Sequence, residues 1–244
     1  MKKQGSITVV IPAFNEENYI GKTLKTILKA ARSYPGTLDI VVVDNNSTDK
    51  TGEIAKKLGA TVVFEKKNQI ARARNTGAAA ATGEYLVFVD ADTTVKGNIF
   101  DKVAHNLSSG KIIGGGAWVE PDSGLGGRLV FKHLVNRLLS LKNVTAGPFL
   151  YCERAAFEKV GGFDEELYTA EEFSLAARLK KEGKKQKKKW KIIKYGKKHK
   201  IITSARKFGV GGFDMFKQNA HLLWGTQRKI RQKEQCRFWY DNRD

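Results

Sequence analysis

The first 95 residues alternate short apolar runs with helical patterns, and this alternation restricts the possible folds more than any other feature of the sequence. Runs rich in β-branched residues predict buried strands at 6–11, 38–44, 61–65 and 85–90. The segments between them carry apolar stripes at helical spacing or helix-capping residues, and each predicts a helix. Because alternating strands and helices build a mostly parallel sheet with helices on both faces, we expect an α/β fold.

The pattern after residue 95 is less regular, but it still predicts secondary structure. The expected helices lie at 98–110, 127–141, 171–183 and 213–233, and a short strand and helix lie within 147–167. Further strands are expected at 111–120, 190–195 and 200–203. The 244 residues suffice for one large α/β domain, which we expect to be followed by a basic C-terminal extension.

Polar residues follow three of the predicted strands at the point where each strand ends. The three clusters lie at 12–17, 44–47 and 90–92. In open α/β sheets, ligands bind outside the carboxyl ends of the strands. We therefore expect these loops to meet at one edge of the sheet and to form the ligand site there.

Two aspartates, Asp90 and Asp92, end the fourth predicted strand. Side chains alternate along an extended chain, so residues two apart point the same way and these carboxylates repel unless a cation joins them. Mg²⁺ and Mn²⁺ take one or two carboxylates together with phosphate oxygens and water. The spacing alone is common in turns, but its position at the ligand edge favours a divalent cation with a diphosphate.

Four stretches, in this order, resemble the inverting family 2 glycosyltransferases, which have the nucleotide-sugar GT-A fold. They are "TVVIPAFNEENYIGKTLKTIL", "IVVVDNNSTDKT", "ARARNTGAAAATGEYLVFVDADT" and "GGFDEELYTAEEFSLAARLKKEG". The resemblance implies a GT-A catalytic domain over residues 1–183. Within it, residues 1–95 would form the nucleotide-binding half and residues 96–183 the acceptor-binding half. Residues 184–244 would be the basic extension.

The resemblance also implies roles for residues of the nucleotide-binding half. The first loop would border the base and ribose through Pro12, Ala13, Phe14 and Glu16. Asp44 would accept a hydrogen bond from the base, and Arg74 would lie near the nucleotide. Asp90 would face the ribose or a metal-bound water, and Asp92 would bind the metal. The stretch "DNNS" departs from the frequent "DDGS" of the family, which bears on the contact with the base.

The general base is expected in the acceptor-binding half. Inverting transfer needs a carboxylate that deprotonates the acceptor hydroxyl as it attacks the anomeric carbon. The family pattern has Glu-Asp after "GGFDE", whereas this chain has Glu171 and Glu172. The resemblance assigns the base to Glu172, but the extra methylene moves its carboxylate, so either the acceptor sits differently or Glu171 shares the role.

The formal net charge of +19 is concentrated near the C-terminus, since residues 180–244 hold 21 Lys and Arg against 5 Asp and Glu. The lysine-rich segment 180–200 suggests an anionic membrane surface, with Trp190, Ile192, Ile193 and Tyr195 entering the interface. Steering of an anionic donor or acceptor is an alternative. Nucleic acid is a weaker one, because no nucleic-acid-binding motif accompanies the charge.

The cysteine count and the lack of a long apolar run suggest where such a protein would work. Two cysteines form no disulfide framework, and no apolar run reaches the roughly 18–20 residues of a membrane helix. We expect a cytoplasmic protein that contacts the inner face of the membrane through residues 180–200. His199 and His221 are weighed as a third metal ligand from the C-terminal part.

The sequence as a whole predicts a metal-dependent transferase. It would move a sugar from a UDP- or GDP-sugar to a hydroxyl on a glycan or lipid carrier, as in polysaccharide biosynthesis. A nucleotidyltransferase on a related sheet is one alternative, although "IPAFNEENYIGK" lacks the Gly-rich loop that holds a triphosphate. A basic module that binds membranes or nucleic acid is the other. The sequence leaves the sugar and the acceptor open.

Overall fold

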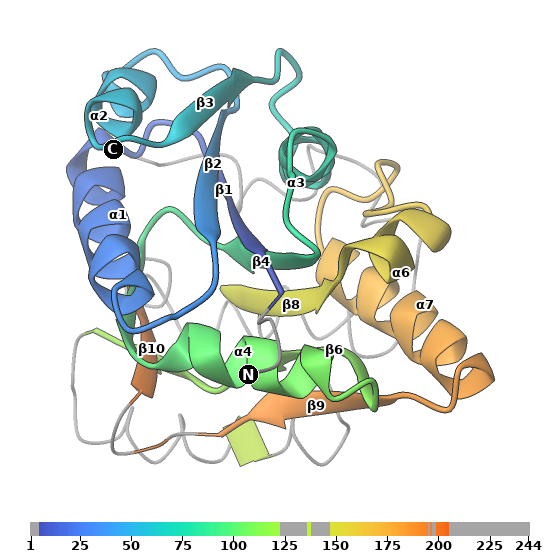
Figure 1. Cartoon of the computed structure of the whole chain (residues 1–244). Coiled ribbons are helices and arrows are strands. Elements are labelled where there is room, and N and C mark those ends of the chain that lie inside the picture. The colour runs from blue at the N-terminus through green and yellow to red at the C-terminus, as the bar shows by residue number, and fades with distance from the viewer. Residues whose placement is uncertain (1–4, 123–135, 138–146, 195, 197–198, 205–244) are drawn as a thin grey trace.

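A seven-stranded sheet forms the centre of the computed structural model, which describes residues 5–122, 136–137, 147–194, 196 and 199–204 (Figure 1). The strands are ordered β3-β2-β1-β4-β8-β6-β9, and β8 runs antiparallel to both of its neighbours. Their bounds are β1 (Ile7–Ala13), β2 (Leu38–Asp44), β3 (Thr61–Phe64), β4 (Tyr85–Val89), β6 (Ile112–Ala117), β8 (Phe149–Glu153) and β9 (Lys189–Ile193). The expected α/β fold with a mostly parallel sheet is therefore confirmed.

Helices cover both faces of this sheet (Figure 1). One face packs against α1 (Glu17–Ala31), α2 (Thr51–Lys57) and α4 (Ile99–Ser108), and the other against α3 (Ile70–Ala79), α6 (Arg154–Lys159) and α7 (Glu171–Lys185). The alternation of strand side chains divides the core in the same way, because Val9 and Ile11 of β1 join the first cluster and Val10 joins the second. All three are fully buried.

A smaller, three-stranded sheet lies beside the end of β4. It has the order β5-β10-β7, with β5 (Thr93–Gly97), β10 (His199–Thr203) and β7 (Val119–Pro121). Residues 111–120 were expected to form one strand, but the chain leaves the central sheet at Trp118, whose amide donates to the Ile193 carbonyl at 2.9 Å, and continues as β7. The small sheet brings the end of the described chain to Asp92, because the Ser204 amide donates to its carbonyl at 3.2 Å.

The predicted elements of the first 95 residues are confirmed. Strands β1, β2 and β4 are parallel, and β1 lies between the other two, so their carboxyl ends meet at one edge. The expected helices at 98–110 and 171–183 appear as α4 and α7. The expected helices at 127–141, apart from residues 136–137, and at 213–233 lie outside the described residues.

The lysine-rich segment contributes the edge strand of the central sheet. Lys189 and Lys191 of β9 are exposed, whereas Trp190 and Ile193 are each only 7% exposed because they point into the core. The expectation that Trp190 and Ile193 enter a membrane interface is therefore wrong. Strand β9 also extends the sheet built by residues 7–153, although the predicted division into domains placed it in the C-terminal extension. Among the described residues, no helix is both long and apolar enough to cross a membrane.

Helix α3 packs very closely on β1 and β2, and Gly77 makes this approach possible. A Cβ atom at this position would overlap Val10 Cγ1 and would lie 2.8 Å from Val43 Cγ2. Both valines are buried strand residues that have little room to move. The absence of a side chain at Gly77 thus sets the distance between the sheet and α3, which carries Arg72, Arg74 and Asn75 toward the ligand edge.

We predict that Gly77→Ala lowers the free energy of unfolding by about 1–3 kcal/mol, because the added methyl group overpacks the helix–sheet contact. Gly21→Ala in α1 is the matched control, since its Cβ would meet Ile54 Cγ2 at an ordinary 3.5 Å. That change should raise the free energy of unfolding by about 0.5–1 kcal/mol through helix propensity. Urea unfolding of the three proteins measures both effects. Equal stability of the two variants would contradict the close approach at Gly77.

Candidate active site

A pocket opens at the carboxyl ends of β1, β2 and β4, where the sequence predicted the ligand site. It is lined by Pro12, Ala13, Phe14, Glu16, Asn45, Asn68, Ile70, Asp90, Ala91 and Asp92. Six predicted site residues are among these: Pro12, Ala13, Phe14, Glu16, Asp90 and Asp92. The other four, Asp44, Arg74, Glu171 and Glu172, lie outside this lining, and their contacts show why.

The loop after β1 is tied to the loop after β2. Asn15 has a left-handed backbone with φ of 50°, and its Oδ1 accepts the Thr48 amide at 2.9 Å. The Glu16 amide in turn donates to Thr51 Oγ1 at 2.8 Å, in a buried position. These bonds fix the wall that contains Pro12, Ala13, Phe14 and Glu16. The wall is therefore rigid before any ligand binds.

Asp44 and Asn45 point in different directions at the end of β2. The Asp44 carboxylate accepts the Ser47 amide at 2.9 Å and lies close to Gly52, so it closes its own turn. The neighbouring side chain, Asn45, lines the pocket instead. The proposed contact between Asp44 and a nucleotide base stays a prediction.

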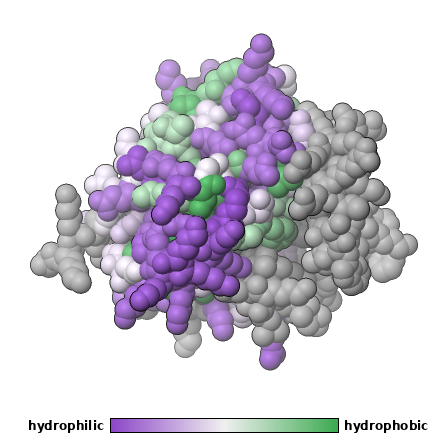
Figure 2. Space-filling view, turned by 90° about the vertical axis from the view of Figure 1, so that its right-hand side faces the viewer, coloured by the Kyte–Doolittle hydropathy of each residue, from purple (hydrophilic) through white to green (hydrophobic). Residues whose placement is uncertain are grey.

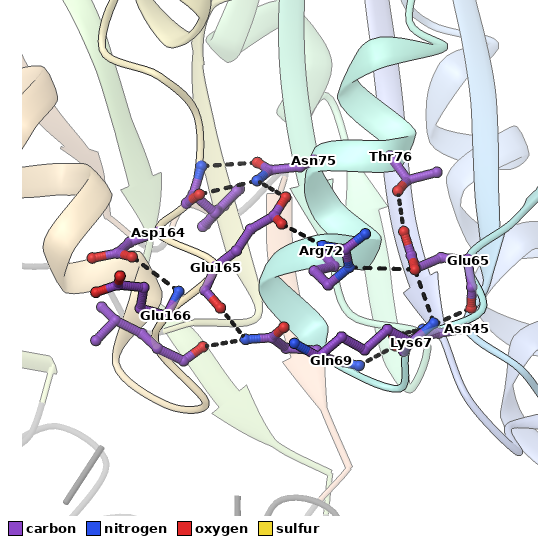
Figure 3. A network of polar contacts seen from close by, with 12 residues as sticks. Asn45, Glu65, Lys67, Gln69, Arg72, Asn75, Thr76, Asp164, Glu165 and Glu166 are labelled. Atoms are coloured by element: carbon purple, nitrogen blue, oxygen red, sulfur yellow. Dashed lines mark hydrogen bonds and ion pairs between the residues drawn. The ribbon is translucent and has the colours of Figure 1, made fainter. Parts of the chain in front are cut away.

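Asn45 holds the loop that precedes α3 (Figure 3). Its Nδ2 donates to the carbonyls of Glu65 at 3.0 Å and Lys67 at 2.6 Å, and its Oδ1 accepts the Gln69 amide at 3.0 Å. An ionised aspartate has no hydrogen-bond donor for these two carbonyls. The asparagine that stands in place of the second aspartate of "DDGS" therefore holds this loop. The loop and the start of α3 supply Asn68 and Ile70 to the pocket, which the sequence did not identify. The only signal for Asn45 was that departure.

Asp90 and Asp92 both reach the pocket from the turn after β4. The turn is held by the Thr93 amide, which donates to the Asp90 carbonyl at 3.1 Å, and Thr203 Oγ1 donates to Asp92 Oδ1 at 3.3 Å. In the part of the chain that the structure describes, no three His, Cys, Asp or Glu side chains gather to hold a metal. His199 is not close to Asp92, because it begins β10 and pairs with Gly97, about 13 Å along the strand from Thr203.

Arg74 lies behind the pocket and joins β4 to α7. Its Nη2 donates to Asp90 Oδ1 at 3.0 Å and its Nη1 donates to Glu171 Oε1 at 2.5 Å. The Phe163 ring lies 5.2 Å from its guanidinium carbon, and the side chain is 2% exposed. The sequence placed Arg74 near the nucleotide, but here both terminal nitrogens bind carboxylates of the protein.

Acidic groups surround this single buried cation. Burial alone would lower the pKa of Arg74, but the carboxylates of Glu171, Asp90 and Glu172 raise it above its ordinary value. Burial, followed by repulsion from Glu172, raises the pKa of Glu171 above its ordinary value, and the Arg74 guanidinium opposes this shift by stabilising the carboxylate. The site therefore has more negative than positive charge, which favours a bound cation.

Glu171 and Glu172 take different positions at the start of α7. Consecutive helical residues point about 100° apart, so Glu171 turns inward to Arg74 while Glu172 is only partly buried. The Glu172 carboxylate lies against Gly147, where any Cβ atom would overlap its Oε1. Gly147 precedes Pro148, whose carbonyl accepts the Asp90 amide at 3.3 Å. The segment before β8 thus runs between Glu172 and the end of β4.

The loop that leads into α7 is fastened to α3 (Figure 3). Gln69 Nε2 donates to the Glu165 carbonyl at 2.6 Å, and Arg72 Nη1 donates to Glu165 Oε2 at 2.7 Å. Asn75 accepts the Phe163 amide at 2.8 Å and donates to the Phe163 carbonyl at 3.0 Å. The position of α7 therefore depends on α3. The loop just before α3 lines the pocket, so the pocket and α7 are both connected to this helix.

Comparison with known proteins gives one family match and several relatives. The model for "Glycosyl transferase family 2" matches residues 8–160. Glycosyltransferase GlyA of Streptococcus pneumoniae is 38% identical over 95 residues, which are 37% of this chain and 13% of GlyA. Glycosyltransferase AglE of Haloferax volcanii is 29% identical over 181 residues, which are 66% of this chain and 57% of AglE.

A solved structure confirms the GT-A fold. Mannosyltransferase PcManGT from Pyrobaculum calidifontis, in complex with GDP-Man and Mn²⁺, superposes with a TM-score of 0.66 at 21% identity, covering 93% of this chain and 66% of that one. The chain spans less than two thirds of the length of each of these three proteins. At this identity, the superposition establishes the arrangement of helices and strands alone.

Proposed function

Because the chain belongs to glycosyl transferase family 2, we propose that it transfers a sugar from a nucleoside diphosphate sugar to an acceptor hydroxyl, with inversion at the anomeric carbon. The pocket beside Asp90 and Asp92 would bind the donor. The start of α7 would serve the acceptor. Both UDP- and GDP-sugars are candidate donors, and a glycan or a lipid carrier is the candidate acceptor.

One observation carries this proposal: a pocket at the ligand edge of the sheet and a partly exposed carboxylate lie on either side of one buried ion-pair cluster. Asp90 lines the pocket and binds Arg74, and Arg74 binds Glu171, which adjoins Glu172. A nucleotidyltransferase would need donors for a triphosphate in the first loop, but that loop supplies Pro12, Ala13, Phe14 and Glu16 to the pocket. This composition favours sugar transfer.

The residues present fit a divalent cation. Two carboxylates on the same wall, with an excess of negative charge behind them, suit a hard cation that also takes diphosphate oxygens and water. Asp92 would be the principal ligand, and Asp90 would support it while bound to Arg74. When bound, Mg²⁺ or Mn²⁺ neutralises charge on the leaving diphosphate. The complex of PcManGT with GDP-Man and Mn²⁺ supports testing this cation first.

Glu172 is the better candidate for the general base. Glu171 is 2% exposed, and its carboxylate accepts a hydrogen bond from Arg74. The hydroxyl of a sugar acceptor therefore cannot approach Glu171 without breaking that pair. Glu172 is partly exposed, and the missing side chain at Gly147 makes room for its carboxylate. A base needs direct contact with the proton that it removes. Glu171 would then hold Arg74 rather than share the proton transfer.

The first prediction concerns the cation. Wild-type protein should bind UDP or GDP in calorimetric titrations with Mn²⁺, and Asp92→Asn should weaken that binding by at least about tenfold, because a ligand charge is lost. With a chelator in place of Mn²⁺, the two proteins should bind equally weakly. Asp101→Asn, which changes a carboxylate on α4, is the control and should bind as wild type does. Equal affinity of the Asp92→Asn and wild-type proteins in Mn²⁺ would rule out this metal site.

The second prediction concerns the base. Glu172→Gln should lower sugar transfer by roughly 10²- to 10⁴-fold while nucleotide affinity stays unchanged, because the amide cannot accept the hydroxyl proton. Release of UDP from UDP-sugars and of GDP from GDP-sugars measures turnover, and calorimetry measures affinity. If Glu171→Gln stops turnover and Glu172→Gln does not, the base is Glu171 and the assignment is wrong.

A second proposal concerns the basic side of the molecule, which we infer contacts anionic membrane lipids by charge alone. Figure 2 faces the side that carries α6 and α7 and shows hydrophilic side chains gathered there. The exposed lysines between residues 181 and 194 are Lys181, Lys184, Lys185, Lys187, Lys189, Lys191 and Lys194. Each lysine near an anionic leaflet contributes about 1 kcal/mol. A role of Lys189 and Lys191 in protecting the sheet edge is compatible with this contact.

Vesicle flotation tests the membrane contact. The protein should float with vesicles that contain phosphatidylserine and not with neutral vesicles, and binding should fall with added salt. Replacing Lys184, Lys189 and Lys191 by Gln should abolish flotation, whereas replacing Lys22, Lys25 and Lys29 of α1 should not. If both triple variants float equally, or if RNA binds in preference to vesicles, the proposal for this surface fails.

A further inference from the structure

A single buried cation connects the donor side of the candidate site to the acceptor side. Arg74 lies on α3, Asp90 begins the turn that lines the pocket, and Glu171 begins α7. We propose that Arg74 is a positioning residue, which acts through Glu171 to fix the Glu172 carboxylate relative to the donor pocket. This inference rests on the proposed function, because it assigns Glu172 as the base.

The contacts of Arg74 leave its side chain little freedom. Its two terminal nitrogens bind different carboxylates, at 3.0 Å for Asp90 and 2.5 Å for Glu171. A guanidinium is planar, so these two bonds fix the directions of both acceptors at once. The Phe163 ring lies 5.2 Å from the guanidinium carbon and belongs to a cluster with Phe88 and Phe157. The cation is thus held by charge at its end and by packing beside it.

Burial makes the pair with Glu171 hard to replace. Arg74 and Glu171 are each 2% exposed, so water cannot take the place of a lost partner. Leaving one buried charge unpaired is strongly unfavourable. The first residue of α7 therefore cannot move away from Arg74 while both remain charged, and Arg74 in turn is anchored to Asp90.

The backbone transmits this constraint from Glu171 to Glu172. Ala170, the residue before α7, has a left-handed backbone with φ of 62° and ψ of 16°, which is unfavourable for a residue with a Cβ atom. Such a conformation persists only where neighbouring contacts impose it. The Glu171–Arg74 pair lies on one side, and Gln69 Nε2, which donates to the Leu167 carbonyl at 3.1 Å, lies on the other. Glu172 follows directly and faces Gly147.

An alternative role for Arg74 is direct contact with the donor diphosphate. The structure argues against this direct contact, because the Arg74 side chain is buried behind Asp90. In the described part of the chain, Arg74 does not belong to the lining of the pocket. The two roles predict different kinetics. A donor contact affects donor affinity, whereas a positioning residue affects turnover by the bound donor.

Hydrogen exchange tests the inference without any activity. Arg74→Met should speed amide exchange in the first turn of α7, residues 171–175, and leave α1 unchanged. Arg74→Lys keeps the charge but cannot donate to both carboxylates as the planar guanidinium does, so exchange in this variant should speed up to a smaller degree. The Lys variant also provides the test if the Met variant does not fold. Arg154→Met is the control, because Arg154 lies beside β8 at the opposite sheet edge. Wild-type exchange at 171–175 in both Arg74 variants would overturn the inference.

Kinetics and calorimetry provide the second readout. In the positioning role, Arg74→Lys and Arg74→Met lower kcat for nucleotide release from UDP-GlcNAc, UDP-glucose or GDP-mannose, by up to about 100-fold. The KM for the donor and the affinity for UDP or GDP in Mn²⁺ stay close to wild type. A raised KM with unchanged kcat would make Arg74 a donor contact and overturn the inference. If wild-type protein releases no nucleotide, the proposed function fails, and the exchange result still decides the role of Arg74.

Discussion

The ion pairs of Arg74 are the interaction on which the candidate site depends. A buried guanidinium needs carboxylates within reach, and the fold supplies them from two separate elements, the turn after β4 and the first turn of α7. Because Asp90 lines the pocket and Glu171 adjoins the candidate base, one side chain relates two places that are far apart in the sequence. The approach of α3 to the sheet at Gly77 brings the arginine to this position. Packing, charge and site geometry are therefore linked through one helix.

The sequence predicted the fold of the first 95 residues well, because the signals there are local. Apolar runs such as "IVVVD" identify buried parallel strands, and parallel strands necessarily bring their carboxyl ends to one edge. That reasoning located Asp90 and Asp92 in the pocket. It could not show that the Asp44 carboxylate accepts an amide of its own turn while the neighbouring Asn45 lines the pocket, because the sequence does not reveal which way each side chain points. Asn45 and Asn68 were missed for the same reason.

Long-range contacts explain the remaining differences. Nothing near Arg74 in the sequence indicates that its partner lies 97 residues later, so the sequence did not predict the ion pair with Glu171. Trp190 and Ile193 alternate with lysines, a pattern that suits both a membrane interface and an edge strand. Only the pairing of β9 with β6 shows that the apolar residues face the core. The exposed lysines of β9 therefore alternate with side chains that face the core.

The contact between Gly147 and Glu172 restricts how this chain can diversify. Every amino-acid replacement of a glycine adds a Cβ atom, and at this position that atom would occupy the place of the Glu172 carboxylate oxygen. Because that oxygen ends a flexible side chain, a replacement at Gly147 would displace the Glu172 carboxylate rather than the backbone of α7. The same property offers a genetic tool: an alanine codon at 147 would move the candidate base while every charged group of the site remains encoded.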